Sequence, residues 1–231
     1  MKRLLLVSSS KVHGSGYLEH CEAQILELFA PIDKVLFVPY ALFDRDAYAR
    51  QARQRFRAMG LELESIHETK DPVAAVGKAE GIFIGGGNSF RLLGELQRRG
   101  LVAPIRDRVE AGMPYLGTSA GSNIACPTIK TTNDMPIVQP ASFTALGLIP
   151  FQINPHYLDS DPDSTHQGET REQRLTEYLE ENDTPVIAIR EGGMIVVAGP
   201  EIKLEGEPGG VLFRKGQRPE EILPGRRIDG L

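Results

Sequence analysis

The chain has only two cysteines, Cys21 and Cys126, among its 231 residues, and it has no tryptophan. Two cysteines so far apart have neither the spacing of a metal site nor the density of a disulfide framework. We therefore expect two free thiols, no bound metal and a protein of the reducing cytoplasm.

Long apolar runs are also missing. No run approaches the ~20 apolar residues that a membrane-spanning helix needs. The basic start of the chain, followed by the apolar run Leu4–Val7, resembles the beginning of a signal peptide, but the run stops at Ser8. A signal peptide needs an apolar core of roughly 7–15 residues. We therefore interpret residues 4–8 as a first strand and expect no contact with a membrane.

Positive charge and aromatic side chains are scarce. The net charge is −5, no basic cluster offsets it, and aromatic residues make up 6% of the chain. A surface that follows nucleic-acid phosphates needs clustered lysine and arginine, so nucleic acid is not the expected partner. The length fits one domain spanning residues 1–231.

Short apolar runs rich in β-branched residues alternate with amphipathic segments. The runs are Leu4–Ser8, Val35–Pro39, Leu61–Ile66, Gly81–Ile84, Tyr115–Leu116 and Val186–Ile189. Residues such as Tyr48, Ala52 and Phe56 recur at helical spacing between them. This alternation predicts an α/β fold with a parallel-rich central sheet and helices on both faces. Short runs over residues 194–198, 202–204 and 211–214 predict C-terminal antiparallel hairpins that extend or cover a sheet edge.

The most informative motif is Gly117-Thr118-Ser119-Ala120-Gly121, which follows a strand-like run and precedes a helical one. A serine at such a turn is pushed outward by the tight backbone, and flanking glycines leave room for that backbone. The motif is short enough to occur by chance in glycine-rich loops, so its meaning depends on a base and an acid elsewhere. With those partners, Ser119 is a candidate nucleophile.

A second glycine cluster, Gly85-Gly86-Gly87, follows another predicted strand. It lacks the spacing of a dinucleotide-binding loop, and a phosphate cradle is the weaker interpretation. We expect the amides of Gly87 and Ala120 to face each other as oxyanion donors across neighbouring strand ends. Asn88 either caps the following helix or touches substrate.

His156 is the candidate general base among five histidines. It follows a strand-like run that ends in Asn154-Pro155, and the proline fixes the backbone just before the imidazole. His13, His20 and His67 are expected to be surface residues. His166, in a polar loop, is the alternative base or a substrate contact.

Glu191 is the candidate orienting acid, because it ends an apolar strand and is followed by two glycines. The alternative is a turn residue paired with Arg190. Asp134, in the segment Thr131–Pro136, is the rival acid or a residue that shapes the pocket floor.

Six ordered motifs together resemble the peptidase E, or α-aspartyl dipeptidase, family. They are Gly85–Asn88, Gly117–Asn123, Cys126–Thr128, Thr131–Pro136, Asn154–His156 and Gly168–Arg174. The resemblance covers roughly residues 1–215. It implies a fold similar to class I glutamine amidotransferases, with serine in place of their cysteine. Thr118 stands where several members of the family have tryptophan.

The resemblance implies hydrolysis of dipeptides with an N-terminal aspartate, without metal or cofactor. It implies Ser119 as nucleophile, His156 as base and Glu191 as acid, in agreement with the choice made from the residues. Recognition of the aspartate side chain calls for a cation, and Arg171 and Arg174 follow the histidine loop. The arginine fork suits a carboxylate, so one of the two is expected to bind substrate while the other pairs with Glu172 or Glu169. We favour Arg171 for the substrate, and a solvated helix face is the alternative.

Two other functions are considered. One is a cyanophycinase-like hydrolase acting on β-linked Asp-Arg units, and the other is a catalytically silent protein that binds a small acidic ligand. The motifs around Asp134 and Arg171 favour the dipeptidase, whose partner is a small acidic dipeptide and whose state is a monomer or homodimer.

Overall fold

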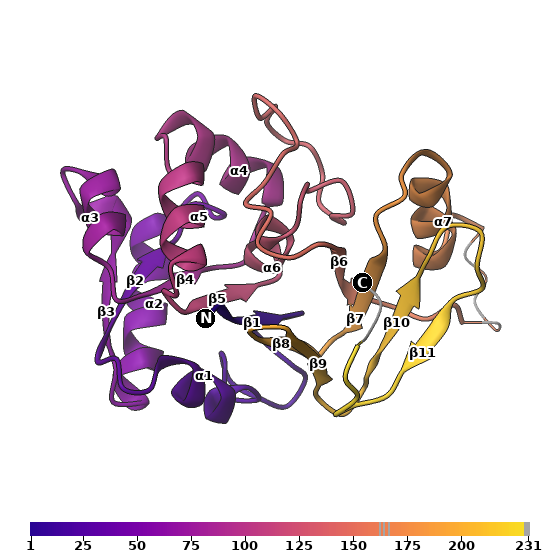
Figure 1. Cartoon of the computed structure of the whole chain (residues 1–231), viewed down its shortest axis with the longest axis horizontal. Helices are drawn as coiled ribbons and strands as arrows, with labels where there is room; N and C mark the ends of the chain where they lie inside the picture. Colours follow the sequence, from indigo (N-terminus) through magenta and orange to yellow (C-terminus); the bar gives the residue numbers. More distant parts are fainter. Residues whose placement is uncertain (162, 164, 166, 229–231) are drawn as a thin grey trace.

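The computed structural model of the chain describes residues 1–161, 163, 165 and 167–228. Strands gather in two sheets, and the larger one has the order β3-β2-β4-β5-β1-β8-β9 (Figure 1). Its strands are β3 (Glu62–Ser65), β2 (Lys34–Val38), β4 (Gly81–Ile84), β5 (Tyr115–Thr118), β1 (Arg3–Val7), β8 (Met194–Ala198) and β9 (Glu201–Glu205). The first five are parallel, whereas β8 and β9 add antiparallel strands beyond β1.

Helices cover both faces of the larger sheet. On one face lie α1 (Glu22–Phe29) and α2 (Arg45–Ala58), which bury apolar stripes against β1, β2 and β4. The other face carries α3 (Pro72–Lys78), α4 (Ser89–Arg98), α5 (Val102–Glu110) and α6 (Ala120–Ala125). A short 3₁₀ helix, η1 (Ile66–Glu68), follows β3. Successive strand side chains alternate between the two faces, so Leu5 packs with α1 while Leu4 and Leu6 pack on the opposite side.

The second sheet has the order β11-β10-β7-β6 and stands beside the first (Figure 1). It consists of β6 (Gln152–Tyr157), β7 (Val186–Arg190), β10 (Gly210–Phe213) and β11 (Glu220–Ile222). Strands β6 and β7 are parallel, and the other neighbours are antiparallel. Helix α7 (Arg171–Glu181) packs on one face, where Leu175 and Leu179 meet Val186 and Phe213. The opposite face, with Ile187 and Ile189, joins the core of the larger sheet.

The predicted fold class is confirmed: a parallel-rich sheet with helices on both faces, followed by antiparallel strands. Two details differ. Residues 186–190 belong to the second sheet, and the C-terminal strands divide, with β8 and β9 pairing onto β1 while β10 pairs with β7. The short strand β11 was not predicted. An apolar run identifies a strand, but its neighbours depend on packing between distant segments.

The arrangement brings strand ends from both sheets together. Residues that follow β1, β4 and β5 lie at one edge of the larger sheet, and hydrogen bonds join this edge to residues around β6 and β7. Ligand sites in open parallel sheets lie at the carboxyl ends of strands, so this junction is the place to look for chemistry. Within the described residues, we find no helix whose length and apolar character would let it cross a bilayer.

Candidate active site

Ser119 occupies the turn between β5 and α6 with φ 51° and ψ −109°. A positive φ is uncommon for a residue with a side chain, and such strained turns are found at functional sites. The turn is fixed to the neighbouring strand, because the Ser119 amide donates a 2.9 Å hydrogen bond to the Val7 carbonyl. The structure therefore has the strand-to-helix serine turn that the sequence predicts.

The glycines around Ser119 are required by close backbone contacts. A Cβ atom at Gly121 would lie 2.1 Å from the carbonyl oxygen of Ile84, and one at Gly117 would lie 2.6 Å from that of Gly121. From the neighbouring strand end, a Cβ at Gly86 would come within 3.1 Å of the Ser119 Cβ. These three glycines thus let the backbone of the serine turn pack closely against itself and against the end of β4.

His156 lies in an irregular part of β6. The pairing of β6 with β7 shifts register between Asn154 and Tyr157, and His156 has φ 54°. A bulge of this kind redirects a side chain. Here the imidazole Nε2 lies 2.8 Å from the Oγ atom of Ser119.

Glu191 directly follows β7, and its Oε1 atom lies 3.0 Å from Nδ1 of His156. The two ring nitrogens of His156 therefore contact Ser119 on one side and Glu191 on the other. With a proton on Nδ1 bonded to the carboxylate, Nε2 is free to accept the serine proton. Arg190 does not pair with Glu191; it forms ion pairs with Asp159 and Glu221 instead.

The amides of Ala120, which directly follows Ser119, and of Gly87, whose neighbour Gly86 lies against the serine turn, are without a protein acceptor in the described part of the chain. Ala120 begins α6, where an amide has no partner within the helix. Gly87 has φ 135°, and a Cβ there would lie 2.7 Å from the Ala41 carbonyl oxygen, so the position requires glycine.

Asn88 is the N-cap of α4. Its Oδ1 atom accepts a 3.0 Å hydrogen bond from the Arg91 amide, and its Nδ2 donates to the carbonyl of Met135 at 2.8 Å. Of the two interpretations of Asn88, the structure therefore has the helix cap, and both ends of the amide are engaged.

Asp134 lies at the same helix end. Its Oδ2 atom accepts hydrogen bonds from the Ser89 amide at 2.7 Å and from the Thr132 hydroxyl at 3.0 Å. The place facing His156 belongs to Glu191, so the structure does not support the interpretation of Asp134 as the orienting acid. Asp134 instead fixes the start of the helix that follows Gly87.

Thr131 and Asn133, in the same segment as Asp134, bind the strand β6 and not the helix α4. Asn133 donates to the Pro155 carbonyl at 2.7 Å, and Thr131 donates to that of Ile153 at 2.8 Å. Alternate residues of one segment therefore hold the strand that carries His156 and the helix that follows the glycine cluster. Sequence reasoning missed this, because all four residues from 131 to 134 are polar and the sequence does not show which of them faces which partner.

Arg171 begins α7 and is part-buried. Burial and the neighbouring Arg174 lower the pKa of its guanidinium group. No carboxylate lies within ion-pair distance of Arg171 among the residues that the structure describes, whereas Arg174 pairs with Glu169 at 3.4 Å. The difference between the two arginines matches the one that the sequence suggests.

The other histidines that the structure describes differ in exposure. His13 is exposed as expected, but His20 and His67 are part-buried. His166, the alternative base, lies outside the described residues.

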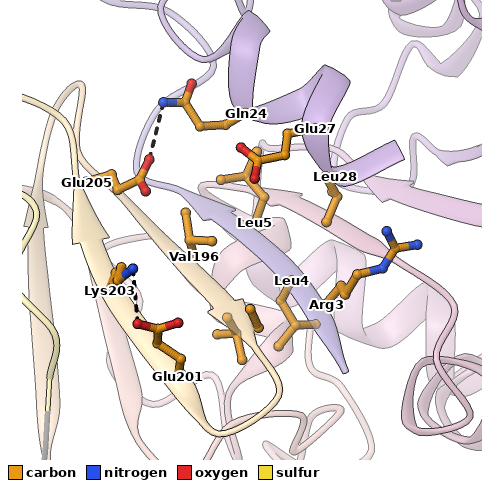
Figure 2. Close-up of a pocket in the computed structure, with 12 residues that line it drawn as sticks. Arg3, Leu4, Leu5, Gln24, Glu27, Leu28, Val196, Glu201, Lys203 and Glu205 are labelled. Carbon is orange, nitrogen blue, oxygen red and sulfur yellow. Dashed lines mark hydrogen bonds and ion pairs between the residues drawn. The ribbon is translucent and has the colours of Figure 1, made fainter. Parts of the chain in front are cut away.

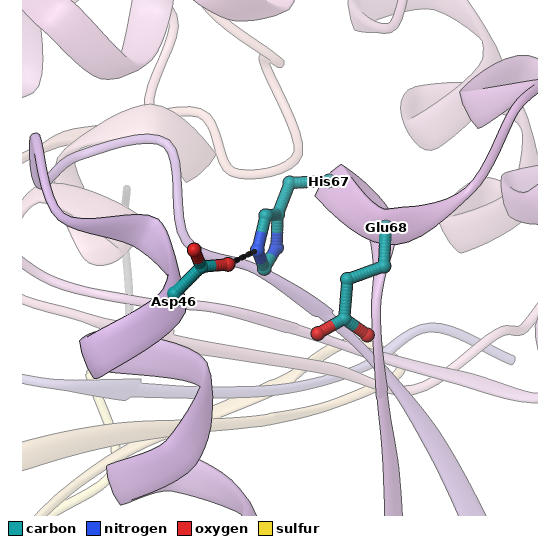
Figure 3. Close-up of side chains that lie close together, drawn as sticks. All are labelled: Asp46, His67 and Glu68. Carbon is teal, nitrogen blue, oxygen red and sulfur yellow. Dashed lines mark hydrogen bonds and ion pairs between the residues drawn. The ribbon is translucent and has the colours of Figure 1, made fainter.

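Figure 3 shows a separate cluster of Asp46, His67 and Glu68, whose ligand atoms lie within 4.8 Å of one another. Every member already has a protein partner. His67 contacts Asp46 at 2.9 Å and Ser65 at 2.6 Å, and Glu68 forms an ion pair with Arg53. A cation bound there would have to displace the Arg53 guanidinium from Glu68. We interpret the cluster as a surface network that ties η1 to α2.

Figure 2 shows a pocket of about 320 Å³ between α1 and the strands β1, β8 and β9. Leu5, Leu28 and Val196 contribute apolar surface. Two pairs of lining side chains interact, Lys203 with Glu201 at 3.0 Å and Gln24 with Glu205 at 3.2 Å. None of the lining residues offers a nucleophile with an adjacent base.

Known proteins resemble this chain over nearly its whole length. The sequence model described as Peptidase family S51 matches residues 4–205. A protein named peptidase E from Streptomyces coelicolor is 50% identical over 228 residues, which are 99% of this chain and 94% of that protein. A probable alpha-aspartyl dipeptidase from Drosophila melanogaster is 46% identical over 226 residues, 96% of this chain and 94% of that protein.

Solved structures show the same relationship. A putative peptidase E protein from Listeria monocytogenes EGD-e superimposes with a TM-score of 0.67 at 26% identity, over 89% of this chain and 98% of that one. A peptidase from an acI-B1 actinobacterium gives a TM-score of 0.72 over 99% of this chain and 96% of that one. Its identity is 20%, so this likeness concerns the fold alone.

Proposed function

Because the chain belongs to peptidase family S51 and is a serine peptidase, we propose that it hydrolyses dipeptides with an N-terminal aspartate through Ser119, His156 and Glu191. The observation that carries the proposal is the continuous contact from Ser119 Oγ to His156 at 2.8 Å and from His156 to Glu191 at 3.0 Å. Each distance is that of a hydrogen bond between groups suited to proton transfer.

In this mechanism, Nε2 of His156 accepts the proton of the Ser119 hydroxyl as Oγ attacks the peptide carbonyl carbon. Glu191 holds the ring tautomer and stabilises the imidazolium ion that forms. His156 then gives the proton to the leaving amine, and the peptide bond breaks. A water molecule activated by the same imidazole attacks the acyl-enzyme, which releases aspartate and restores Ser119.

The amides of Gly87 and Ala120 are proposed to receive the oxyanion. Ala120 directly follows Ser119, Gly87 directly follows Gly86, which lies against the serine turn, and both amides are without protein acceptors among the described residues. Donors that are already in place stabilise negative charge as it develops, because they need no reorganisation during the reaction. Loss of one such donor lowers turnover by about 10²–10³-fold.

Arg171 is proposed to bind the aspartate side chain. It is part-buried without a carboxylate partner in the described residues, so a substrate carboxylate would complete an otherwise uncompensated site. One of the relatives is named a probable alpha-aspartyl dipeptidase, which supports the same substrate class. The free, buried cysteines suit a reducing compartment, and we propose the cytoplasm as the location.

Hydrolysis of Asp-Leu, Glu-Leu, Asn-Leu and Asp-Leu-Leu tests the proposal, with Ser119→Ala as the matched inactive protein. We expect rapid cleavage of Asp-Leu alone, and a loss of about 10⁴-fold or more in the variant. Cleavage of all four peptides would leave a serine peptidase but overturn the aspartyl specificity. If Asp-Leu stayed intact while a β-linked Asp-Arg substrate was cleaved, the cyanophycinase-like alternative would replace the proposal.

A further inference from the structure

Ser8 lies directly after β1, and its side chain is fully buried at the junction of the two sheets. It belongs to none of the groups discussed so far. We propose that Ser8 is the positioning residue that holds His156 in its reactive orientation. The proposal rests on the role of His156 as the base.

One hydroxyl group makes two contacts across the junction. The Oγ atom of Ser8 accepts a 2.8 Å hydrogen bond from the backbone amide of His156 and donates a 2.9 Å hydrogen bond to the Ile189 carbonyl. A serine hydroxyl has one donor and can accept at the same time, so both contacts can form together. Ser8 therefore connects β6 to β7 at the level of the catalytic residues.

His156 depends on this contact because of its backbone. With φ 54° in an irregular part of β6, it lies outside the regular pairing with β7. In the part of the chain that the structure describes, the Ser8 hydroxyl is the only acceptor for the His156 amide. A backbone conformation of this kind persists only when its surroundings hold it in place.

The end of β1 also contacts the segments that carry Ser119 and Glu191. Val7 accepts the hydrogen bond from the Ser119 amide at 2.9 Å, and the Ser8 amide donates to the Gly193 carbonyl at 3.0 Å. Ile189 and Gly193 stand two residues before and two residues after Glu191. Two consecutive residues at the end of β1 thus fix the nucleophile turn, the base and the segment that carries the acid.

Loss of the Ser8 hydroxyl should leave the triad residues present but poorly aligned. Proton transfer depends steeply on the distance between Ser119 and His156, and a displacement of about 1 Å costs up to about 10²-fold in rate. Ser8→Ala removes the hydroxyl without adding volume. Ser8→Thr keeps the hydroxyl and is the conservative variant.

Ser65→Ala is a matched control. Ser65 also lies at the end of a parallel strand, is also buried, and its hydroxyl contacts His67 at 2.6 Å, away from the site. The same atom is therefore removed from a similar setting.

The experiment measures the rate constant for covalent labelling of the serine by a fluorophosphonate, followed by mass spectrometry. This reaction needs an activated Ser119 but no aspartate in the reagent. We expect labelling at least about tenfold slower in Ser8→Ala, within about twofold of wild type in Ser65→Ala, and largely restored in Ser8→Thr. An unfolded fraction would lower the amount labelled and leave the rate constant of the folded molecules unchanged.

The outcomes distinguish failure of the positioning role of Ser8 from failure of the proposed triad. If the wild-type protein labels at Ser119 and Ser8→Ala labels equally fast, Ser8 has no positioning role while the triad stands. If the wild-type protein is not labelled at Ser119, the triad fails and this proposal fails with it. For Ser8→Ala we also expect a lower kcat for Asp-Leu, with KM within about twofold of wild type.

Discussion

The carboxylate of Glu191 lies 3.0 Å from Nδ1 of His156, on the side of the ring opposite to Ser119. His156 lies in β6 and Glu191 directly follows β7, both in the second sheet. Ser119 directly follows β5 of the first sheet. The proposed acid and base are therefore placed by neighbouring parallel strands, and the proposed nucleophile meets them across the junction.

Replacement of Glu191 by glutamine tests this relationship. Glu191→Gln keeps an oxygen near His156 but removes the charge that stabilises the imidazolium ion, so we expect kcat for Asp-Leu to fall by about 10²–10⁴-fold. Asp134→Asn is the matched control, because Asp134 caps α4 through Ser89. Its activity should stay within about tenfold of wild type, with a stability loss of about 0.5–2 kcal/mol. The reverse order of the two effects on kcat would identify Asp134 as the orienting acid.

Removal of the Arg171 charge should weaken selection for aspartate. Arg171→Met keeps the apolar stem, and we expect kcat/KM for Asp-Leu to fall by about 10²-fold or more while that for Asn-Leu changes little. Arg174→Met serves as the comparison, because Arg174 already pairs with Glu169. Its kcat/KM should change by no more than about threefold. Equal losses in both variants would point to a general effect of helix charge and against a carboxylate contact.

The cysteines should be inert in the folded protein. Burial raises the pKa of the thiols of Cys21 and Cys126 to about 12. At pH 8 only about 10⁻⁴ of each thiol is then ionised, and the thiolate is the reactive form. We expect iodoacetamide to leave native activity unchanged and to label two sites after unfolding, as measured by mass spectrometry. Inactivation in step with labelling of one cysteine would contradict a serine mechanism.

The ion pair between Asp159 and Arg190 should contribute to stability at neutral pH. The bidentate hydrogen bonds from Arg190 lower the pKa of Asp159, with distances of 2.7 Å to each carboxylate oxygen. A lowered pKa means that the contribution is present above the unfolded value of about 3.9 and is lost as the pH falls through the folded value.

We therefore expect Asp159→Asn to lower the free energy of unfolding at pH 7 by up to about 1 kcal/mol, because the carboxylate is more than half exposed. The difference from wild type should shrink below about pH 4. Asp183→Asn is the comparison, because Asp183 pairs with Lys215 through one 2.9 Å contact and is 90% exposed. Denaturant melts across this pH range measure both, and a difference for Asp159→Asn that grew toward low pH would reverse the sign of the argument.

Local sequence was sufficient to identify the three residues that the structure brings together. Glycines around Ser119, proline before His156 and glycines after Glu191 each mark a strand end where the backbone leaves its regular path. Such signals are local, and all three residues lie where the strand ends of the two sheets meet. The two amides without protein acceptors in the described residues, those of Gly87 and Ala120, could be predicted from the sequence for the same reason.

Long-range partners were not accessible from the sequence. Ser8 stands in a run of three serines, and its hydrogen-bond partners lie 148 and 181 residues away in the chain. Asp134 sits in a segment whose members bind alternately to the strand of His156 and to the start of α4. No property of either residue in isolation predicts its partner, because the partner is decided by which strand ends meet.

Ser119 and His156 both have a positive φ, and this backbone strain lowers the stability of the folded protein. A conformation of this kind costs about 1–3 kcal/mol at each residue that carries a side chain, and glycine would adopt it without that cost. Substitutions at these two positions that relieve the strain also remove the proposed nucleophile or the proposed base. On the proposed mechanism, activity is therefore kept at a cost in thermodynamic stability, which a variant that lost the activity could regain.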